Sequence, residues 1–425
     1  MTDSTSTTAG EGAIDPYRGR SHRDLALLVR ELLLCGHMID RSGMPHLIER
    51  YGRDGMAEIA IAEWMGASPI YSRRMQTLLD FESPSVATIC KNIQLDIGGP
   101  LEFLDFRFTI HDDDHAEFHL DHCGALMDVE PMGEDYVHTM CHTIEDPTFD
   151  ATAAATNPRA RIRPIHRPPR TPADRHPHCA WTITVEADAE PLPFPGDAER
   201  VADSEVARLP LAARPADLSD DDGANDYRGP MDPDLALSRF SSATLAAIAD
   251  EVALQGHLLS RAFLLPVTDR SGGAEAVVVG GKQVCGVAGL AAKRLAALLD
   301  AEPDLAGVAE ILAVHPVFLP RAYVDLRMSD PGSELLVSIA PCPALGEADG
   351  LSWPQIMVEH DDRALSAIIH AVTPRARVQR VTPLPDTVAT WQITLDPVAD
   401  PAPQFDEVTL TEYSTGAAFN FQRPA

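Results

Sequence analysis

The chain has 425 residues, with 64 Asp and Glu against 34 Lys and Arg, and a formal net charge of −30 at pH 7. A chain this acidic is a poor partner for nucleic acid or for an anionic membrane surface. No apolar run approaches the roughly 18 residues that a membrane-spanning helix needs, and no nucleotide-binding motif is found.

The N-terminal residues 1–20 have neither the basic region nor the apolar region of a signal peptide. We therefore expect a disordered tail and a cytoplasmic protein. In that compartment the seven cysteines are expected as thiols or metal ligands, because stable disulfides belong to oxidising environments.

The chain repeats its own pattern at a constant spacing, so that Gly36-His37 recurs as Gly256-His257. The same offset relates Ser21 to Ser241. Further matches keep the same order along the chain, and they join Asp80 to Asp300, Asp105 to Asp325, Cys123 to Cys342, 158–161 to 374–377 and Trp181 to Trp391. Such order-preserving matches indicate a tandem domain duplication. We call residues 21–186 the first half and residues 236–425 the second half.

The first half begins with leucines at helical spacing after a capping-box signal at Ser21 and Asp24. Three further helices are predicted at 45–64, 71–80 and 85–95. The pattern then changes to strands at 103–110 and 116–123 around the turn 111–114. A helix at 134–155, kinked or interrupted at Pro147, precedes two strands at 159–165 and 178–186, which a loop at 166–177 joins.

The second half repeats this order. Its predicted elements are a helical region at 245–312, strands at 322–328 and 334–340, a helix at 353–371, and strands at 375–381 and 387–395. The fold class is therefore α+β, with each half a helical part followed by a β-β-α-β-β antiparallel sheet. Residues 187–235 are rich in Pro, Ala and Asp and predict a long acidic linker. Such a linker would let the first half pack on the second as a pseudo-dimer.

The first half holds most of the chemically reactive residues, with five of the seven cysteines and twelve of the sixteen histidines. The second half has Val358 in place of Cys141, Ala389 in place of Cys179, Ser338 in place of His119, Pro341 in place of His122 and Glu359 in place of His142. Because the surrounding scaffold is kept, folding did not require these residues. The asymmetry points to chemistry in the first half and a silent second half.

A metal site is one interpretation of these residues. Alternation along a strand predicts that His119, Asp121 and Cys123 share a face. Helical spacing predicts one polar stripe of His138, Cys141, His142 and Glu145. If Cys123, Cys141 and Cys179 converge, with His119 or His142 as a fourth ligand, the set suits zinc or iron. The alternative is that these cysteines are buried thiols that pack as small hydrophobic groups.

A second interpretation needs no metal. Cys141 is flanked by His142 and Glu145, so a thiolate at Cys141 could act as a nucleophile. Cys35 and Cys90 are interpreted as core residues, and the repeated His37 and His257 as packing residues. The loop 166–177 either gates a pocket or is a solvated loop.

The order of these features resembles a known family. A strand ends in Cys123, a helix carries Cys141-His-Thr-Ile-Glu-Asp146, a break follows at Asn157-Pro158, and a last strand begins Cys179-Ala-Trp181. Together with the helix Ile48-Glu-Arg-Tyr-Gly52, this is similar to the 2-aminothiazoline-4-carboxylate hydrolase-like proteins and, more distantly, to 4-vinyl reductase-type ligand-binding domains. The likeness covers residues 25–185, and the segment 174–178 departs from the family's usual Gly-Asp.

The resemblance implies a small-molecule pocket over the sheet and, in the hydrolase branch, ring opening at a C=N carbon. Only Cys123, Cys141 and Cys179 correspond to family positions. We therefore expect an enzyme that hydrolyses or hydrates a small organic molecule in the first half, with a metal or a thiolate at this site. His142 or Glu145 would move protons. The alternatives are a non-catalytic ligand-binding or sensor protein and a structural or accessory subunit.

Overall fold

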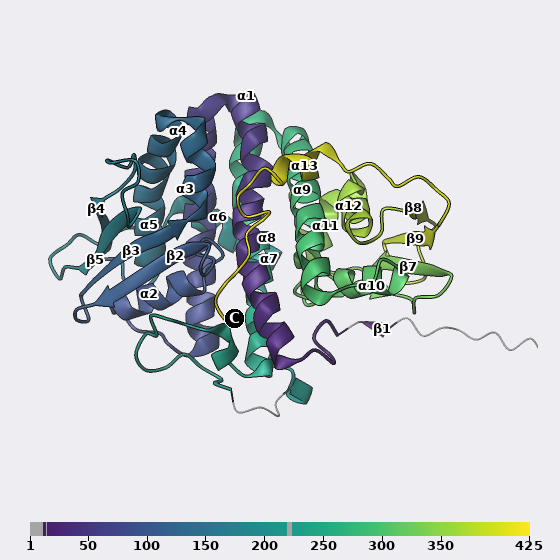
Figure 1. Cartoon of the computed structure of the whole chain (residues 1–425), viewed down its shortest axis with the longest axis horizontal. Helices are drawn as coiled ribbons and strands as arrows, with labels where there is room; N and C mark the ends of the chain where they lie inside the picture. Colours follow the sequence, from purple (N-terminus) through teal and green to yellow (C-terminus); the bar gives the residue numbers. More distant parts are fainter. Residues whose placement is uncertain (1–11, 14, 219–222) are drawn as a thin grey trace, which may run out of the picture.

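The computed structural model describes residues 12–13, 15–218 and 223–425. Two antiparallel sheets lie on opposite sides of a central layer of long helices (Figure 1). The expected α+β class is confirmed. Most of the predicted disordered tail and the acidic residues 220–222 of the predicted linker lie outside the described residues.

The helical part of the first half is a hairpin. Helix α1 (His22–Leu79) begins at a capping box on Ser21 and ends at Asp80, which is in the left-handed conformation. It reverses direction at Gly52, whose φ of 71° is readily adopted only by glycine. The predicted separate helices at 45–64 and 71–80 are therefore wrong, because the chain breaks only at Gly52 and continues helically on both sides. Helix α2 (Val86–Gln94) follows as predicted.

The second half has the same helical layout at the same offset. Helices α8 (Ser242–Ser271) and α9 (Gly273–Leu299) meet at Gly272, which has a φ of 86°. Helix α8 is capped by Ser241, and α9 ends at the left-handed Asp300. Helix α10 (Leu305–Val314) takes the position of α2.

The two sheets have the same strand order. In the first half, β2 (Leu104–Ile110), β3 (His115–Cys123), β5 (Cys179–Val185) and β4 (Ala160–His166) are neighbours in the order β2-β3-β5-β4. In the second half, β6 (Leu326–Met328), β7 (Glu334–Ile339), β9 (Ala389–Leu395) and β8 (Ala376–Val381) follow the order β6-β7-β9-β8. Seven of the eight predicted strands are matched to within about two residues, and only β6 is markedly shorter.

The helix between the strand pairs differs between the halves. In the first half, α3 (Gly124–Val129) leads to α4 (Glu134–His138), a π-helical stretch (Thr139–Ile144) and α5 (Glu145–Ala154). The predicted helix is thus continuous, and its irregularity is a π-helical stretch just before Pro147, where a ring without an N–H disturbs regular α-helical bonding. In the second half, α11 (Trp353–Glu359) and α12 (Arg363–Val372) are separate helices.

Equivalent residues of the two halves face each other across the helical layer. Arg74 pairs with Glu251 (Nε–Oε2 2.7 Å), and Arg294 pairs with Glu31 at the same distance. These four positions are related by the repeat offset. The two pairs are therefore equivalent contacts, as in a two-fold interface. Tyr51 and Ser271, which are equivalent positions, bond to each other at 2.8 Å.

The segment between the halves is packed against the helices, which corrects the expectation of an extended linker. It contains α6 (Gly196–Ala202) and α7 (Glu205–Arg208), and its Val201, Val206 and Tyr227 are fully buried. Apolar side chains on these short helices outweigh the acidic composition, because burying them against α1 and α8 removes apolar surface from water.

The ends of the chain also cross between halves. Strand β1 (Gly12–Ala13) pairs with β6, and Tyr17 donates a hydrogen bond to Asp250, so part of the predicted disordered tail is ordered. After α13 (Asp406–Thr411), the C-terminal residues return to the first half, where Arg423 pairs with Asp105. Single-turn 3-10 helices complete the described structure at Glu130–Met132, Ala216–Leu218, Leu237–Arg239, Pro316–Phe318 and Pro343–Gly346.

Helix α9 is long and apolar enough to cross a membrane by length and composition, although no such run was expected. In this fold, 72% of its most apolar window is buried. Burial of this kind is typical of the core helix of a folded protein.

Candidate functional site

The first half contains a partly open cavity with a volume of about 200 Å³. Its walls come from both arms of α1, from the inner face of the sheet, and from the helical run α4–α5. Most lining side chains are apolar, and the aromatic ones are Trp64, Phe106, Tyr136, Phe149 and Trp181. A few polar groups also reach the cavity. Apolar cavities with a few polar groups are the usual sites of small-molecule binding.

The sheet wall carries two of the predicted site cysteines. Cys179 and Leu120 are paired across β3 and β5, and both are buried. Cys123 is on the same face as Leu120 because β3 has a bulge between them, where two residues of β3 oppose one of β2. The residue after Cys123 is Gly124, and a larger residue would not fit there, because an added Cβ would lie 2.0 Å from the ring of Phe103.

The bulge corrects the predicted position of His119. Simple alternation placed His119 and Cys123 on one face, but the extra residue moves Cys123 inward. His119 faces outward, with 40% of its side chain exposed, and lies 3.4 Å from Asp121. His119 therefore cannot join Cys123 at an interior site.

The helical wall carries the other predicted residues. Cys141 is buried within the π-helical stretch. The His142 ring stacks on His138 at 4.0 Å, and its Nε2 lies 2.7 Å from the Pro168 carbonyl oxygen. Of the proposed catalytic residues, Glu145 lines the cavity, whereas Cys141 and His142 do not.

The three cysteines lie close enough to influence one another electrostatically. Burial, the charge of Glu145 and the neighbouring sulfurs all raise the pKa of the Cys141 thiol. Burial likewise raises the pKa of Cys123 to about 12 and strongly raises that of Cys179. These groups are thus thiols at neutral pH, which is unfavourable for a thiolate nucleophile.

Glu145 is the titratable group on the helical wall. Its removal from solvent raises its pKa to about 8, although the Arg167 guanidinium acts in the opposite direction. Arg167 comes from the loop 166–177 and also pairs with Asp146, while Arg170 of the same loop makes two 2.7 Å bonds to Glu130. The loop is therefore held by ion pairs to α5 and to the 3-10 turn that begins at Glu130. At neutral pH Glu145 is mostly a carboxylic acid facing the cavity, and such a group can donate a proton.

Sequence reasoning did not identify three further carboxyl groups, two on α1 and one in the turn that follows α2. Asp40 and Asp96 line the cavity, and Glu63 lies beside Asp40 on the opposite arm of the hairpin. Burial raises the pKa of Asp40 to about 7 and that of Asp96 to about 6. Burial and the charge of Asp40 raise that of Glu63 well above its ordinary range. The available signal was that Asp40 and Glu63 become the neutral Ser260 and Gln283 in the repeat.

His37 forms one end of the cavity wall. Its Nε2 lies 2.8 Å from Asp128, and burial lowers its pKa to about 4, so it is neutral at pH 7. Although burial acts to raise the pKa of Asp128, bonds from His37 and Thr415 and the charge of Arg41 bring it down to about 2. This network ties the C-terminal segment to the first half, in agreement with the packing role expected for His37.

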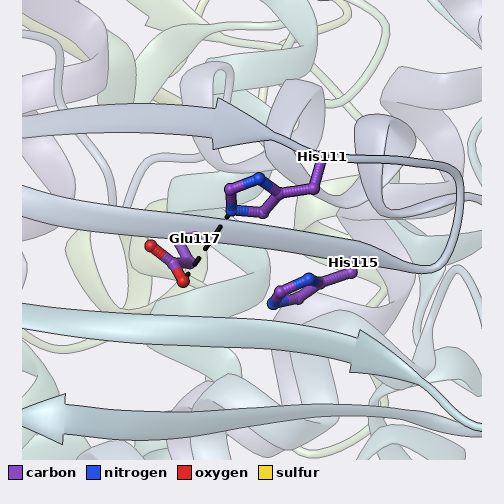
Figure 2. Close-up of side chains that lie close together, drawn as sticks. All are labelled: His111, His115 and Glu117. Carbon is purple, nitrogen blue, oxygen red and sulfur yellow. Dashed lines mark ion pairs between the residues drawn. The ribbon is translucent and has the colours of Figure 1, made fainter.

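One group in the described part of the chain has the geometry to hold a metal ion (Figure 2). His111, His115 and Glu117 have ligand atoms that all lie within 4.8 Å of one another. They lie at the β2–β3 turn, with stacked imidazoles 4.7 Å apart. Among the described residues, Cys123, Cys141 and Cys179 do not form such a group. The missed signal was the His-x3-His-x-Glu spacing, which a hairpin brings to one face.

The equivalent region of the second half is filled. Ser260 donates a hydrogen bond to Gln283 at 3.0 Å, and Trp353 donates to the same oxygen at 3.3 Å. Trp353 is almost fully buried, and a Cβ on Gly280 would lie 2.7 Å from Ile356. Side chains of α11 thus occupy space that corresponds to the cavity of the first half.

No protein-family model, curated protein or solved structure matches this chain. The similarity to hydrolase-like and 4-vinyl reductase-type domains therefore stays a prediction. A functional proposal has to depend on the chemistry of the site, since folds alone do not determine function.

Proposed function

We propose that the first half binds a small, mainly apolar organic molecule in its interior cavity. The observation that carries this proposal is the cavity of about 200 Å³, whose apolar and aromatic wall is interrupted by a few acidic groups. An apolar pocket with a small number of converging polar groups is the usual form of a small-molecule site.

The two halves are proposed to be tandem copies of one domain that pack as a pseudo-dimer. The shared strand order and the mirrored Arg74–Glu251 and Arg294–Glu31 pairs support this proposal. The second half would then be a silent partner, since Trp353 and Ile356 fill the corresponding space.

Hydrolysis or hydration is the second candidate, and Glu145 favours it. A carboxylic acid with a pKa of about 8 could protonate a C=N nitrogen while water adds to the carbon, and the resulting carboxylate would take up the proton that the added water loses. This chemistry agrees with the hydrolase branch of the resembled family. Cys123 and Cys179 would then shape the pocket as thiols, and Cys141 would pack behind it.

A zinc or iron ion is proposed at His111, His115 and Glu117. Two imidazoles and one carboxylate are a ligand set that zinc accepts and that iron also uses. Elemental analysis of the purified protein tests this: one equivalent of metal is expected, and His115→Ala should remove it. Metal that is retained in His115→Ala would contradict the assignment.

Cavity occupancy tests the proposed function. A ligand that binds only the folded state raises the melting temperature by mass action. We expect members of a panel of small aromatic and aliphatic molecules, including toluene and 2-phenylethanol, to stabilise the wild type but not Ala60→Leu, which places a larger side chain on the cavity wall. Ala213→Leu, at an exposed site, is the control. Equal shifts in Ala60→Leu, or no shift with any compound, would refute the proposal.

A further inference from the structure

The α1 hairpin brings two carboxyl groups together at the inner end of the cavity. Asp40 is on the first arm and lines the cavity. Glu63 follows the lining residues Met56 and Ala60 at the spacing i, i+4 and i+7, so it lies on the same stripe of the second arm. The negative charge of Asp40 acts directly on Glu63, which means that the two groups are neighbours.

Three of the four oxygens of these two carboxyl groups lack a hydrogen-bond partner within the protein. Glu63 is completely buried, and neither of its oxygens has a hydrogen-bond partner. Asp40 accepts a bond from Trp64, but its Oδ1 also has none. Buried polar atoms are nearly always hydrogen-bonded, so three unpartnered oxygens at one place call for an explanation.

The positive charge that acts on Asp40 is that of Arg41, which is shared with Asp128. Among the residues that line the cavity, the basic side chains are His37 and Arg41. His37 is neutral at pH 7, and Arg41 lies 3.2 Å from Asp128. Asp96 and Glu145 add two further carboxyl groups to the wall. The cavity therefore has an excess of acidic groups.

The second half shows what this position becomes without a ligand site. Ser260 and Gln283 replace Asp40 and Glu63 and bond to each other at 3.0 Å, and Trp353 completes the set. A neutral pair, hydrogen-bonded through the Gln283 Oε1, thus serves the same helical hairpin. Folding of the hairpin does not require two acids, so the pair in the first half serves another purpose.

We infer that the ligand of the cavity is an organic cation, a small apolar molecule with a protonated amine that binds between Asp40 and Glu63. This inference rests on the proposed small-molecule site and deepens it. The amine would donate to the unpartnered oxygens, and the aromatic wall would cover the apolar body of the ligand. A metal ion is a poorer occupant, because the described residues contain no three-ligand group at this position.

Calorimetric binding of 2-phenylethylamine and its neutral analogue 2-phenylethanol at pH 7.5 tests the inference. The wild type is expected to bind the amine about 10- to 100-fold more tightly, the value of charged hydrogen bonds to a buried partner. The variant Asp40→Ser/Glu63→Gln copies the pair of the second half and is expected to fold. It should bind both compounds with similar affinity.

Glu58→Gln is the matched control, because it removes one acidic group from an exposed position that pairs with Arg270. It should keep the preference for the amine. Equal affinity of the wild type for both compounds would overturn the organic-cation inference and leave the proposed function standing. If the wild type bound neither compound, this inference would also be overturned. The proposed function would then be decided by the panel of small aromatic and aliphatic molecules. An amine preference that persists in the double variant would also overturn the organic-cation inference.

Discussion

The mirrored ion pairs between the halves allow a quantitative test of the pseudo-dimer. Arg74 makes two bonds to Glu251, at 2.7 and 2.8 Å, and also donates to the carbonyl oxygens of Leu209 and Pro210. Only 2% of the Glu251 side chain is exposed. In Arg74→Met, Glu251 keeps a bond from the Ala212 N–H but loses its counterion.

Removal of one partner from a buried ion pair costs about 3 to 5 kcal/mol, because the remaining charge stays desolvated. We therefore expect Arg74→Met to lower the free energy of unfolding by this amount. Arg74→Met/Glu251→Met should be about 1 to 3 kcal/mol more stable than Arg74→Met, since it removes the stranded charge as well. Arg294→Met should resemble Arg74→Met, because its pair with Glu31 is equivalent.

Equilibrium unfolding in urea, followed by circular dichroism at pH 7, measures these differences. The control is Arg200→Met, because both members of the Arg200–Asp269 pair are largely exposed and such pairs contribute less than about 1 kcal/mol. If Arg74→Met cost no more than Arg200→Met, the buried pair would not stabilise the interface. If the losses of unfolding free energy in Arg74→Met and Arg294→Met differed severalfold, the two ion pairs would not be energetically equivalent and the two-fold relation would be contradicted.

Three further predictions concern the first half and its cysteines. The pKa of Glu145 in the folded protein is raised to about 8. Its contribution to the free energy of unfolding is therefore complete below its ordinary pKa and is lost as the pH rises through 8. Glu145→Gln should lose less stability than the wild type between pH 5 and 8. Iodoacetamide at pH 8 should modify the partly exposed Cys342 before the three buried cysteines near the cavity, and faster labelling of those three by peptide mapping would restore the thiolate interpretation. Gly124→Ala should destabilise by about 1 to 3 kcal/mol because its Cβ would overlap Phe103, whereas Gly196→Ala, with nothing within 4 Å, should be close to neutral in the same unfolding assay.

The repeat made much of the fold predictable. The caps at Ser21 and Ser241 and the left-handed ends at Asp80 and Asp300 are local features that recur at the same offset. The β-β-α-β-β order was predicted because alternation and turn residues act over a few neighbouring positions. The extended linker was wrong because burial of residues such as Val201 depends on distant helices, which composition does not reveal.

The site was predicted only in part. The sequence indicated that the first half carries the chemistry, and Glu145 does line its cavity. It placed His119 on the wrong face, because one extra residue in a strand reverses the side-chain direction and only strand pairing shows where that residue lies. The metal-capable group at His111, His115 and Glu117 depends in the same way on the pairing of β2 with β3.

The sequence by itself thus determined the class of fold, and it predicted a duplication and the half in which to look for function. These properties depend on residue type and on spacing along the chain. Tertiary structure alone decided that Asp40 and Glu63 meet with three of their four oxygens unpartnered and that Cys123, Cys141 and Cys179 are buried thiols. Those facts depend on how two helical arms and a bulged sheet pack together, and on the loss of solvent that packing imposes on each carboxyl and thiol group.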